Sequence, residues 1–168
     1  SGPDVVCQND TETYGMDEVN AAADYNWTIT PAIGSTTSTS NTANINWTAP
    51  GTAEICVTVS NLCFDNPAES CFEVEVQPTP TATLTASGAL CAEGDDSGVE
   101  VSISFTGNGP WEFVYTEGGS AQPPVTTNDN PYVFNVTTPG LVQLQSISGN
   151  GCPGTVTGSV NIQETVIT

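Results

Sequence analysis

The chain has 168 residues, of which 19 are Asp or Glu and none is Lys, Arg or His, so its formal net charge is −19 at pH 7. Without basic side chains it cannot make the cationic phosphate contacts on which nucleic-acid binding depends, and an anionic membrane surface does not attract it. The missing His and Lys also exclude Ser-His-Asp, Cys-His and Schiff-base chemistry and the common general bases. We therefore predict that the protein is not an enzyme and has no catalytic residues.

The sequence contains no apolar run of about 18 residues and no basic amino-terminal segment, which predicts neither membrane insertion nor a signal peptide. Its opening, Ser1-Gly2-Pro3, is typical of a piece of a longer mature protein. Six cysteines in a small chain rich in Thr, Val, Ser and Asn indicate an oxidising, extracellular compartment.

Alternation of apolar and polar residues predicts β-strands with one buried and one solvated face. The pattern occurs first at 54–59, then at 99–105 and again at 111–115. Its apolar members are Ile55, Val57, Val59, Val99, Val101, Ile103, Phe105, Trp111, Phe113 and Tyr115. Only Ala21-Ala22-Ala23 favours a helix, and it is too short to form one, so we predict an all-β protein.

A stiff segment, Gln77-Pro78-Thr79-Pro80-Thr81, divides the chain, because proline fixes its own φ and donates no ladder hydrogen bond. We predict one domain at 1–77, a linker at 78–81 and a second domain at 82–168.

The two halves share a weak internal repeat. Cys7 precedes Trp27 by 20 residues, and Cys91 precedes Trp111 by 20. Later in each half, Asn61-Leu62-Cys63 matches Asn150-Gly151-Cys152. The simplest explanation is two domains with one ancestor.

Short motifs of the first half occur in a characteristic order: Val6-Cys7, Tyr25-Asn26-Trp27-Thr28-Ile29, Ile45-Asn46-Trp47, Gly51, Ile55-Cys56-Val57-Thr58-Val59 and Asn61-Leu62-Cys63. With them, residues 1–77 resemble the PKD-like immunoglobulin domains that occur in tandem in large secreted and surface proteins of bacteria. The Trp-Asp-Phe-Gly-Asp-Gly segment of PKD domains is missing, because Trp27 is followed by Thr28-Ile29-Thr30-Pro31. The resemblance is therefore to a divergent branch.

The second half has its own motifs: Cys91, Glu93-Gly94-Asp95, Gly107-Asn108-Gly109-Pro110-Trp111, Pro131-Tyr132-Val133-Phe134 and Asn150-Gly151-Cys152. They are similar to a second Ig-like module that often accompanies the first. Together the resemblances imply two Ig-like antiparallel β-sandwich domains in series. Such modules usually serve as spacers or adhesive repeats, often in proteins exported by the type IX pathway.

Three disulfides are predicted from the domain split, which leaves three possible pairings for the six cysteines. Cys91 can pair within its domain only with Cys152, so the internal repeat selects Cys7–Cys63 in the first domain. Cys56 and Cys71 remain, and both alternate against apolar neighbours on the solvated face of adjacent strands. A redox switch or a metal cluster is the functional alternative to this structural role.

Trp27 and Trp111 are predicted to be core residues, as the sandwich tryptophan of Ig domains is. A carbohydrate-binding platform would instead require exposed aromatic rings. Trp47 is predicted to face inward with Ile45 on an edge strand.

Two acidic segments contain residue types that occur in catalytic or metal sites. Asp96-Ser97-Gly98 matches the aspartic-protease triplet, but that reaction needs two such carboxylates and the chain has one copy. Glu93, Asp95 and Asp96 are weak candidates for Ca²⁺, which prefers several oxygen ligands; a solvated acidic loop is the simpler interpretation. No other cofactor is predicted, and Asp10, Glu12, Asp17 and Glu18 form a still less specific group.

The sequence thus predicts a structural spacer repeat of a bacterial cell-surface adhesin or filament. Its expected partners are neighbouring copies in a head-to-tail array, with the closing strand after Val160 running into Ser1 of the next copy and the termini at opposite ends of an elongated molecule. The alternative is a glycan-binding accessory module of a secreted enzyme.

Overall fold

The computed structural model describes residues 1–19, 24–60, 68–91 and 98–165. The chain divides into two compact units, Ser1–Pro78 and Thr79–Thr168, and each is described by itself. The described residues form strands, turns and irregular segments without a helix. Within them, accordingly, no helix has the length and apolar character needed to cross a membrane.

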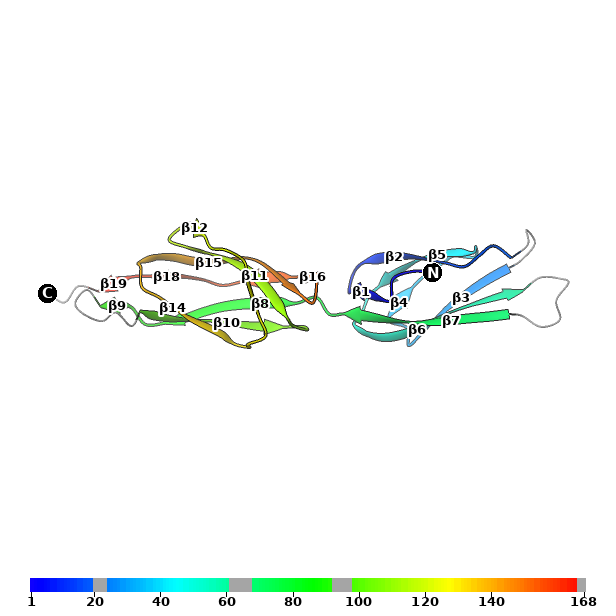
Figure 1. The fold of residues 1–168 in the computed structure, drawn as a ribbon, viewed down its shortest axis with the longest axis horizontal. Helices are drawn as coiled ribbons and strands as arrows, with labels where there is room; N and C mark the ends of the chain where they lie inside the picture. Colours follow the sequence, from blue (N-terminus) through cyan, green and yellow to red (C-terminus); the bar gives the residue numbers. More distant parts are fainter. Residues whose placement is uncertain (20–23, 61–67, 92–97, 166–168) are drawn as a thin grey trace. The chain divides into compact units, whose positions relative to one another are not determined.

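The first unit is a sandwich of two sheets (Figure 1). One sheet has the order β1-β7-β6-β3 and the other the order β2-β5-β4. The strands are β1 (Val5–Cys7), β2 (Thr11–Gly15), β3 (Asp24–Thr30), β4 (Gly34–Ser35), β5 (Thr42–Trp47), β6 (Gly51–Ser60) and β7 (Ala68–Gln77).

The core of the first unit follows the predicted alternation. Ile55, Val57 and Val59 of β6 are buried, while Glu54 on the same strand is exposed. The prediction for Trp47 was wrong in one respect: β5 lies between β2 and β4 and is not an edge strand. Trp47 is 0% exposed there.

The second unit contains two larger sheets and a small one (Figure 1). One sheet has the order β14-β10-β8-β17; in the other, β12-β11-β15-β16, β13 also pairs with β11 and β18 with β15. The third is the pair β19-β9. The strands are β8 (Thr81–Ser87), β9 (Leu90–Cys91), β10 (Val99–Thr106), β11 (Trp111–Glu117), β12 (Ser120–Ala121), β13 (Val125–Thr127), β14 (Tyr132–Val136), β15 (Gly140–Gly149), β16 (Cys152–Pro153), β17 (Thr155–Thr157), β18 (Ser159–Ile162) and β19 (Glu164–Thr165).

Aromatic side chains from both sheets meet in the core of the second unit. The rings of Phe105 and Trp111 are stacked, with centroids 5.1 Å apart, and Phe113 packs against Phe105 at 5.5 Å. The alternation predicted along β11 weakens after Phe113, because the β11–β15 register shifts between Val114 and Tyr115. Tyr115 is therefore half-buried.

In both units the first strand pairs in parallel with a strand from the carboxyl-terminal part of the unit. In the first unit β1 pairs parallel to β7, with Val6 opposite Val76. In the second, β17 pairs parallel to β8, with Val156 opposite Ala82. β7 and β17 therefore run in the same direction as the strand with which their unit begins.

Candidate functional site

The outer face of β6 and β7 carries a disulfide between Cys56 and Cys71, as predicted. The two residues lie directly opposite each other in the antiparallel ladder, and their Cα atoms are 4.1 Å apart. Cys56 is half-buried and Cys71 is exposed. The bridge thus joins adjacent strands on the solvated side of the sheet.

Carboxylates surround this disulfide. Glu54 and Glu73 are the neighbouring cross-strand pair on the same face, and Glu69 lies opposite Thr58 on the other side. A carboxylate oxygen of Glu54 lies within 4.8 Å of the sulfur atoms of both Cys56 and Cys71. This trio is not a metal site while the disulfide is intact, because metal ions bind cysteine as the thiolate.

Sequence reasoning did not single out these carboxylates, although a signal was available. In an antiparallel pair of strands, moving two residues back along one strand means moving two residues forward along the other. The predicted Cys56–Cys71 pair therefore also places Glu54 opposite Glu73, which is the observed register.

The other predicted bridges fall partly outside the described residues. Cys7 and Cys152 are both disulfide-bonded. Cys63, the predicted partner of Cys7, lies in the undescribed segment 61–67, and the side chain of Cys91, the predicted partner of Cys152, is not described either. Those two pairings stay predictions.

Both tryptophans of the internal repeat are core residues, as predicted. Trp27 and Trp111 are each 8% exposed. The indole N–H of Trp27 donates to the Ser40 carbonyl at 2.9 Å, and that of Trp111 donates to the Thr106 carbonyl at 3.2 Å. Their ring faces are therefore not available as a carbohydrate platform.

A buried polar pair lies between the sheets of the first unit. The Tyr14 ring packs edge-on against Trp47, with centroids 6.0 Å apart, and lies 5.3 Å from Phe72. Within the described residues, neither the Tyr14 hydroxyl nor the Trp47 indole N–H has a hydrogen-bond partner of good geometry. Burial raises the pKa of Tyr14; the nearby Trp47 indole lowers it by a smaller amount, and the Glu12 carboxylate adds to the increase.

The Ca²⁺ candidates Glu93, Asp95 and Asp96 lie in the segment 92–97, outside the described residues, as does Ser97 of the protease-like triplet. The less specific group is on the first unit, where Asp10, Asp17 and Glu18 are exposed and Glu12 is half-buried.

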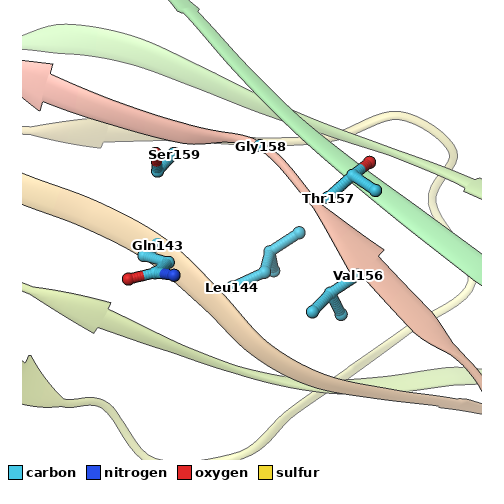
Figure 2. Close-up of a pocket in the computed structure, with 6 residues that line it drawn as sticks. All are labelled: Gln143, Leu144, Val156, Thr157, Gly158 and Ser159. Atoms are coloured by element: carbon cyan, nitrogen blue, oxygen red, sulfur yellow. The ribbon is translucent and has the colours of Figure 1, made fainter.

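Two shallow hollows are lined by neutral side chains. Figure 2 shows the one in the second unit, where the chain passes from β17 to β18 beside β15. It encloses about 200 Å³ and is lined by Gln143, Leu144, Val156, Thr157, Gly158 and Ser159. The hollow in the first unit encloses about 290 Å³ and is lined by Thr36, Thr37, Ser38, Ser40, Thr42 and Asn44. Neither lining contains a titratable group.

The comparisons with known families divide the chain as the structure does. Residues 1–74 match the PKD-like domain. Residues 80–161 match the Ig-like domain of nucleoporin POM152. No curated protein matches the chain in sequence.

Solved structures of tandem Ig domains share the fold at low identity. The I-band fragment I67-I69 of titin matches with a TM-score of 0.54 and 11% identity, over 96% of this chain and 62% of the fragment. The C-terminal 282-residue fragment of intimin, solved with the intimin-binding domain of its translocated receptor, matches with a TM-score of 0.53 and 16% identity, over 93% of this chain and 58% of that one. This chain thus spans less than two thirds of either protein.

Both family matches describe non-catalytic modules, and the disulfides indicate an oxidising, extracellular setting. The sheets, the buried tryptophans and the two matched ranges lead to the same conclusion: the chain is a PKD-like domain followed by an Ig-like domain.

Proposed function

We propose that this protein is a structural spacer repeat of a bacterial extracellular adhesin or filament, joined head to tail with neighbouring copies. The path of the chain through each unit is the observation that carries the proposal. A repeat can extend an array only when the chain enters and leaves each unit at separate points along it.

The second unit meets this requirement. Its first strand begins at Thr81, which lies beside Thr155. Its last described strand, β19, places Glu164 beside Leu90, beyond the far end of β8. At about 3.3 Å per residue, the seven-residue strand β8 separates these two points.

In the first unit the chain enters partway along the sandwich and leaves at one end (Figure 1). The Gly15 amide donates to the Ser1 carbonyl at 2.9 Å, which places Ser1 at the end of the β2–β5 ladder where Gly15 pairs with Thr42. The opposite end of that ladder contains Trp47, whose carbonyl accepts from the Asn9 amide at 2.7 Å. The preceding residue, Gln8, donates to the carbonyl of Gln77 at 2.8 Å, where β7 ends.

Disulfide bridges suit a module that bears load, and the described one, Cys56–Cys71, joins two adjacent strands of one sheet. The chain contains no Lys, so it cannot form Lys–Asn isopeptide cross-links, and disulfides are its available covalent reinforcement. Each closed loop of this kind adds roughly 3–4 kcal/mol of stability in the chain-entropy model.

The glycan-binding alternative has less support. Sugar-binding platforms stack ligands on exposed aromatic rings. Every aromatic residue whose side chain is described is buried or half-buried. The large apolar residues that are exposed in the described part of the chain are all aliphatic: Val5, Val19, Val133 and Leu141.

A two-copy protein, with Thr168 of one copy joined directly to Ser1 of the next, tests the proposal by small-angle X-ray scattering. We expect its maximum dimension to approach twice that of the single copy. A matched protein with a long flexible Gly-Ser segment between the copies should give a broader, shorter distribution. A direct fusion no longer than the single copy would contradict the proposal, and specific binding on a glycan array would favour the alternative.

A further inference from the structure

The Cys56–Cys71 disulfide is the most accessible bridge in the described part of the chain. Side chains are described for four cysteines: Cys152 is 3% exposed, Cys7 and Cys56 are half-buried, and Cys71 is exposed. A small thiol can therefore approach the Cys71 sulfur from solvent. Access of this kind is one of the factors that control thiol–disulfide exchange.

The approach to Cys71 passes through a negative field. Glu69 and Glu73 lie two residues before and after Cys71, on the same face of β7, because side chains alternate along a strand. Across the ladder, Glu54 lies next to the disulfide itself. All three carboxylates are exposed. The chain has no Lys, Arg or His to offset them.

We propose that Cys56–Cys71 is a thiol-exchange site selective for aminothiols, at which Glu54, Glu69 and Glu73 slow the reaction of anionic thiols. In the exchange, the thiolate of the reagent attacks the Sγ atom of Cys71 and forms a mixed disulfide with it. The bond between the two protein sulfurs breaks, and Cys56 leaves as a thiolate that takes a proton from water. The reagent's own charge then decides how fast this step occurs.

The size of the selectivity follows from Coulomb's law. A unit charge about 6 Å from a carboxylate in water changes the free energy enough to alter a rate about threefold at low ionic strength. Cysteamine carries an ammonium group and mercaptoacetate a carboxylate, so the two reagents differ by two charges. With three carboxylates near Cys71, we expect the rate constants to differ by at least about tenfold.

Exchange kinetics test this directly on the intact protein. The rate constants for the reaction of cysteamine and of mercaptoacetate with the Cys56–Cys71 disulfide are measured and expressed per concentration of thiolate. The extent of exchange is followed by alkylation and peptide mass spectrometry at Cys56 and Cys71. Each rate constant is divided by the rate constant of the same thiol with a neutral small disulfide, bis(2-hydroxyethyl) disulfide, which corrects for intrinsic nucleophilicity. The ratio of the corrected rate constants, cysteamine to mercaptoacetate, should be well above one at about 0.01 M salt and approach one at about 1 M. Over this range the Debye length falls from about 30 Å to about 3 Å, so added salt screens the carboxylates.

The variant E54Q/E73Q should reduce the preference for cysteamine several-fold while leaving the fold intact. E100Q/E112Q is the matched control, because Glu100 and Glu112 are exposed carboxylates of the other unit; it should leave the preference unchanged. Should E54Q/E73Q fail to fold, E69Q and the salt dependence of the unaltered protein provide the same test. Equal corrected rates for the two thiols at low salt, or equal effects of the two variants, would overturn the proposal.

Discussion

Glu54 and Glu73 lie directly opposite each other across β6 and β7, two pairs along the ladder from the Cys56–Cys71 disulfide and on the same face. Like charges in this position destabilise a sheet, and the neighbouring covalent bond holds the strands together where the carboxylates repel. The sheet therefore combines a local electrostatic cost with a local covalent gain.

Glu73→Thr should stabilise the first unit, because it removes the repulsion and introduces a residue that favours strands. We expect a gain of about 0.2–1 kcal/mol in the free energy of unfolding at low salt, decreasing as salt is added. Urea denaturation measures it. Glu112→Thr is the control, since Glu112 faces Ser148 and Thr126 and has no carboxylate opposite; an equal gain there would show that the charge pair contributes nothing.

The Cys56–Cys71 register shows what a sequence can predict. Alternation placed both cysteines on the solvated face of adjacent strands, and alternation is local, so it can be read without the fold. Trp47 shows the limit. Its strand, β5, was predicted to be an edge strand, but it pairs with β4 on one side. β4 consists of only Gly34 and Ser35, which is too short to show any periodicity in the sequence.

The direction of strand pairing was also beyond the sequence. β17 runs parallel to β8 although the two strands are more than 60 residues apart in the chain. Nothing in the alternation of Thr155-Val156-Thr157 distinguishes parallel from antiparallel pairing, because side chains alternate in both. The three carboxylates near Cys71, those of Glu54, Glu69 and Glu73, can likewise be placed together only when it is known which strands pair and in which register.

Replacing both Cys56 and Cys71 with Ser should destabilise the first unit by about 3 kcal/mol, the value expected for closing a loop of this length; the sequence separation is 15. The two units have separate cores, so the unfolding transition of the second should not move. Urea denaturation followed by tryptophan fluorescence measures both. An unchanged midpoint for the first unit would show that the bridge does not stabilise it.

Gly158 is the residue at which the chain passes from β17 to β18, with φ +92°, and a Cβ there would lie 2.3 Å from the Leu84 carbonyl oxygen. Gly158→Ala should therefore cost more than about 2 kcal/mol, because both the backbone conformation and the contact are unfavourable. Gly118 is the control: its φ is +56° and a Cβ would meet nothing within 4 Å. Gly118→Ala should cost about 1 kcal/mol, the conformational penalty alone. Thermal melting compares the two, and equal losses would contradict the steric explanation.

Ca²⁺ binding at Glu93, Asp95 and Asp96 is a prediction that the described residues do not test. If the ion binds the folded state, millimolar Ca²⁺ should raise the Tm above its value in excess chelator by mass action. The triple variant E93Q/D95N/D96N should abolish that difference. An equal Tm with Ca²⁺ and with chelator would remove the metal hypothesis.

Tyr14 makes the first unit sensitive to alkaline pH. Its pKa is raised above the ordinary value of about 10 because burial disfavours the charged phenolate, an effect that the Trp47 indole partly offsets and Glu12 reinforces. The folded state therefore holds the phenolic proton more tightly than the unfolded state. This contribution to stability is complete below about pH 10 and is lost as the pH rises from there through the raised pKa.

Tyr14→Phe separates this pH effect from the cost of burying the hydroxyl. At neutral pH the variant should be as stable as the unaltered protein or more stable, because a buried hydroxyl without a hydrogen-bond partner costs about 1–3 kcal/mol. Above about pH 10 its advantage should grow, since Phe has no proton to lose. Tyr115→Phe is the comparison: the pKa of Tyr115 is also raised, first by burial and then by Glu117 and Tyr132, but its side chain is only half-buried, so its effect should be smaller. Urea denaturation at neutral and alkaline pH measures both variants. A Tyr14→Phe protein less stable than the original at neutral pH would mean that the hydroxyl is satisfied, for instance by an internal water molecule shared with the Trp47 indole.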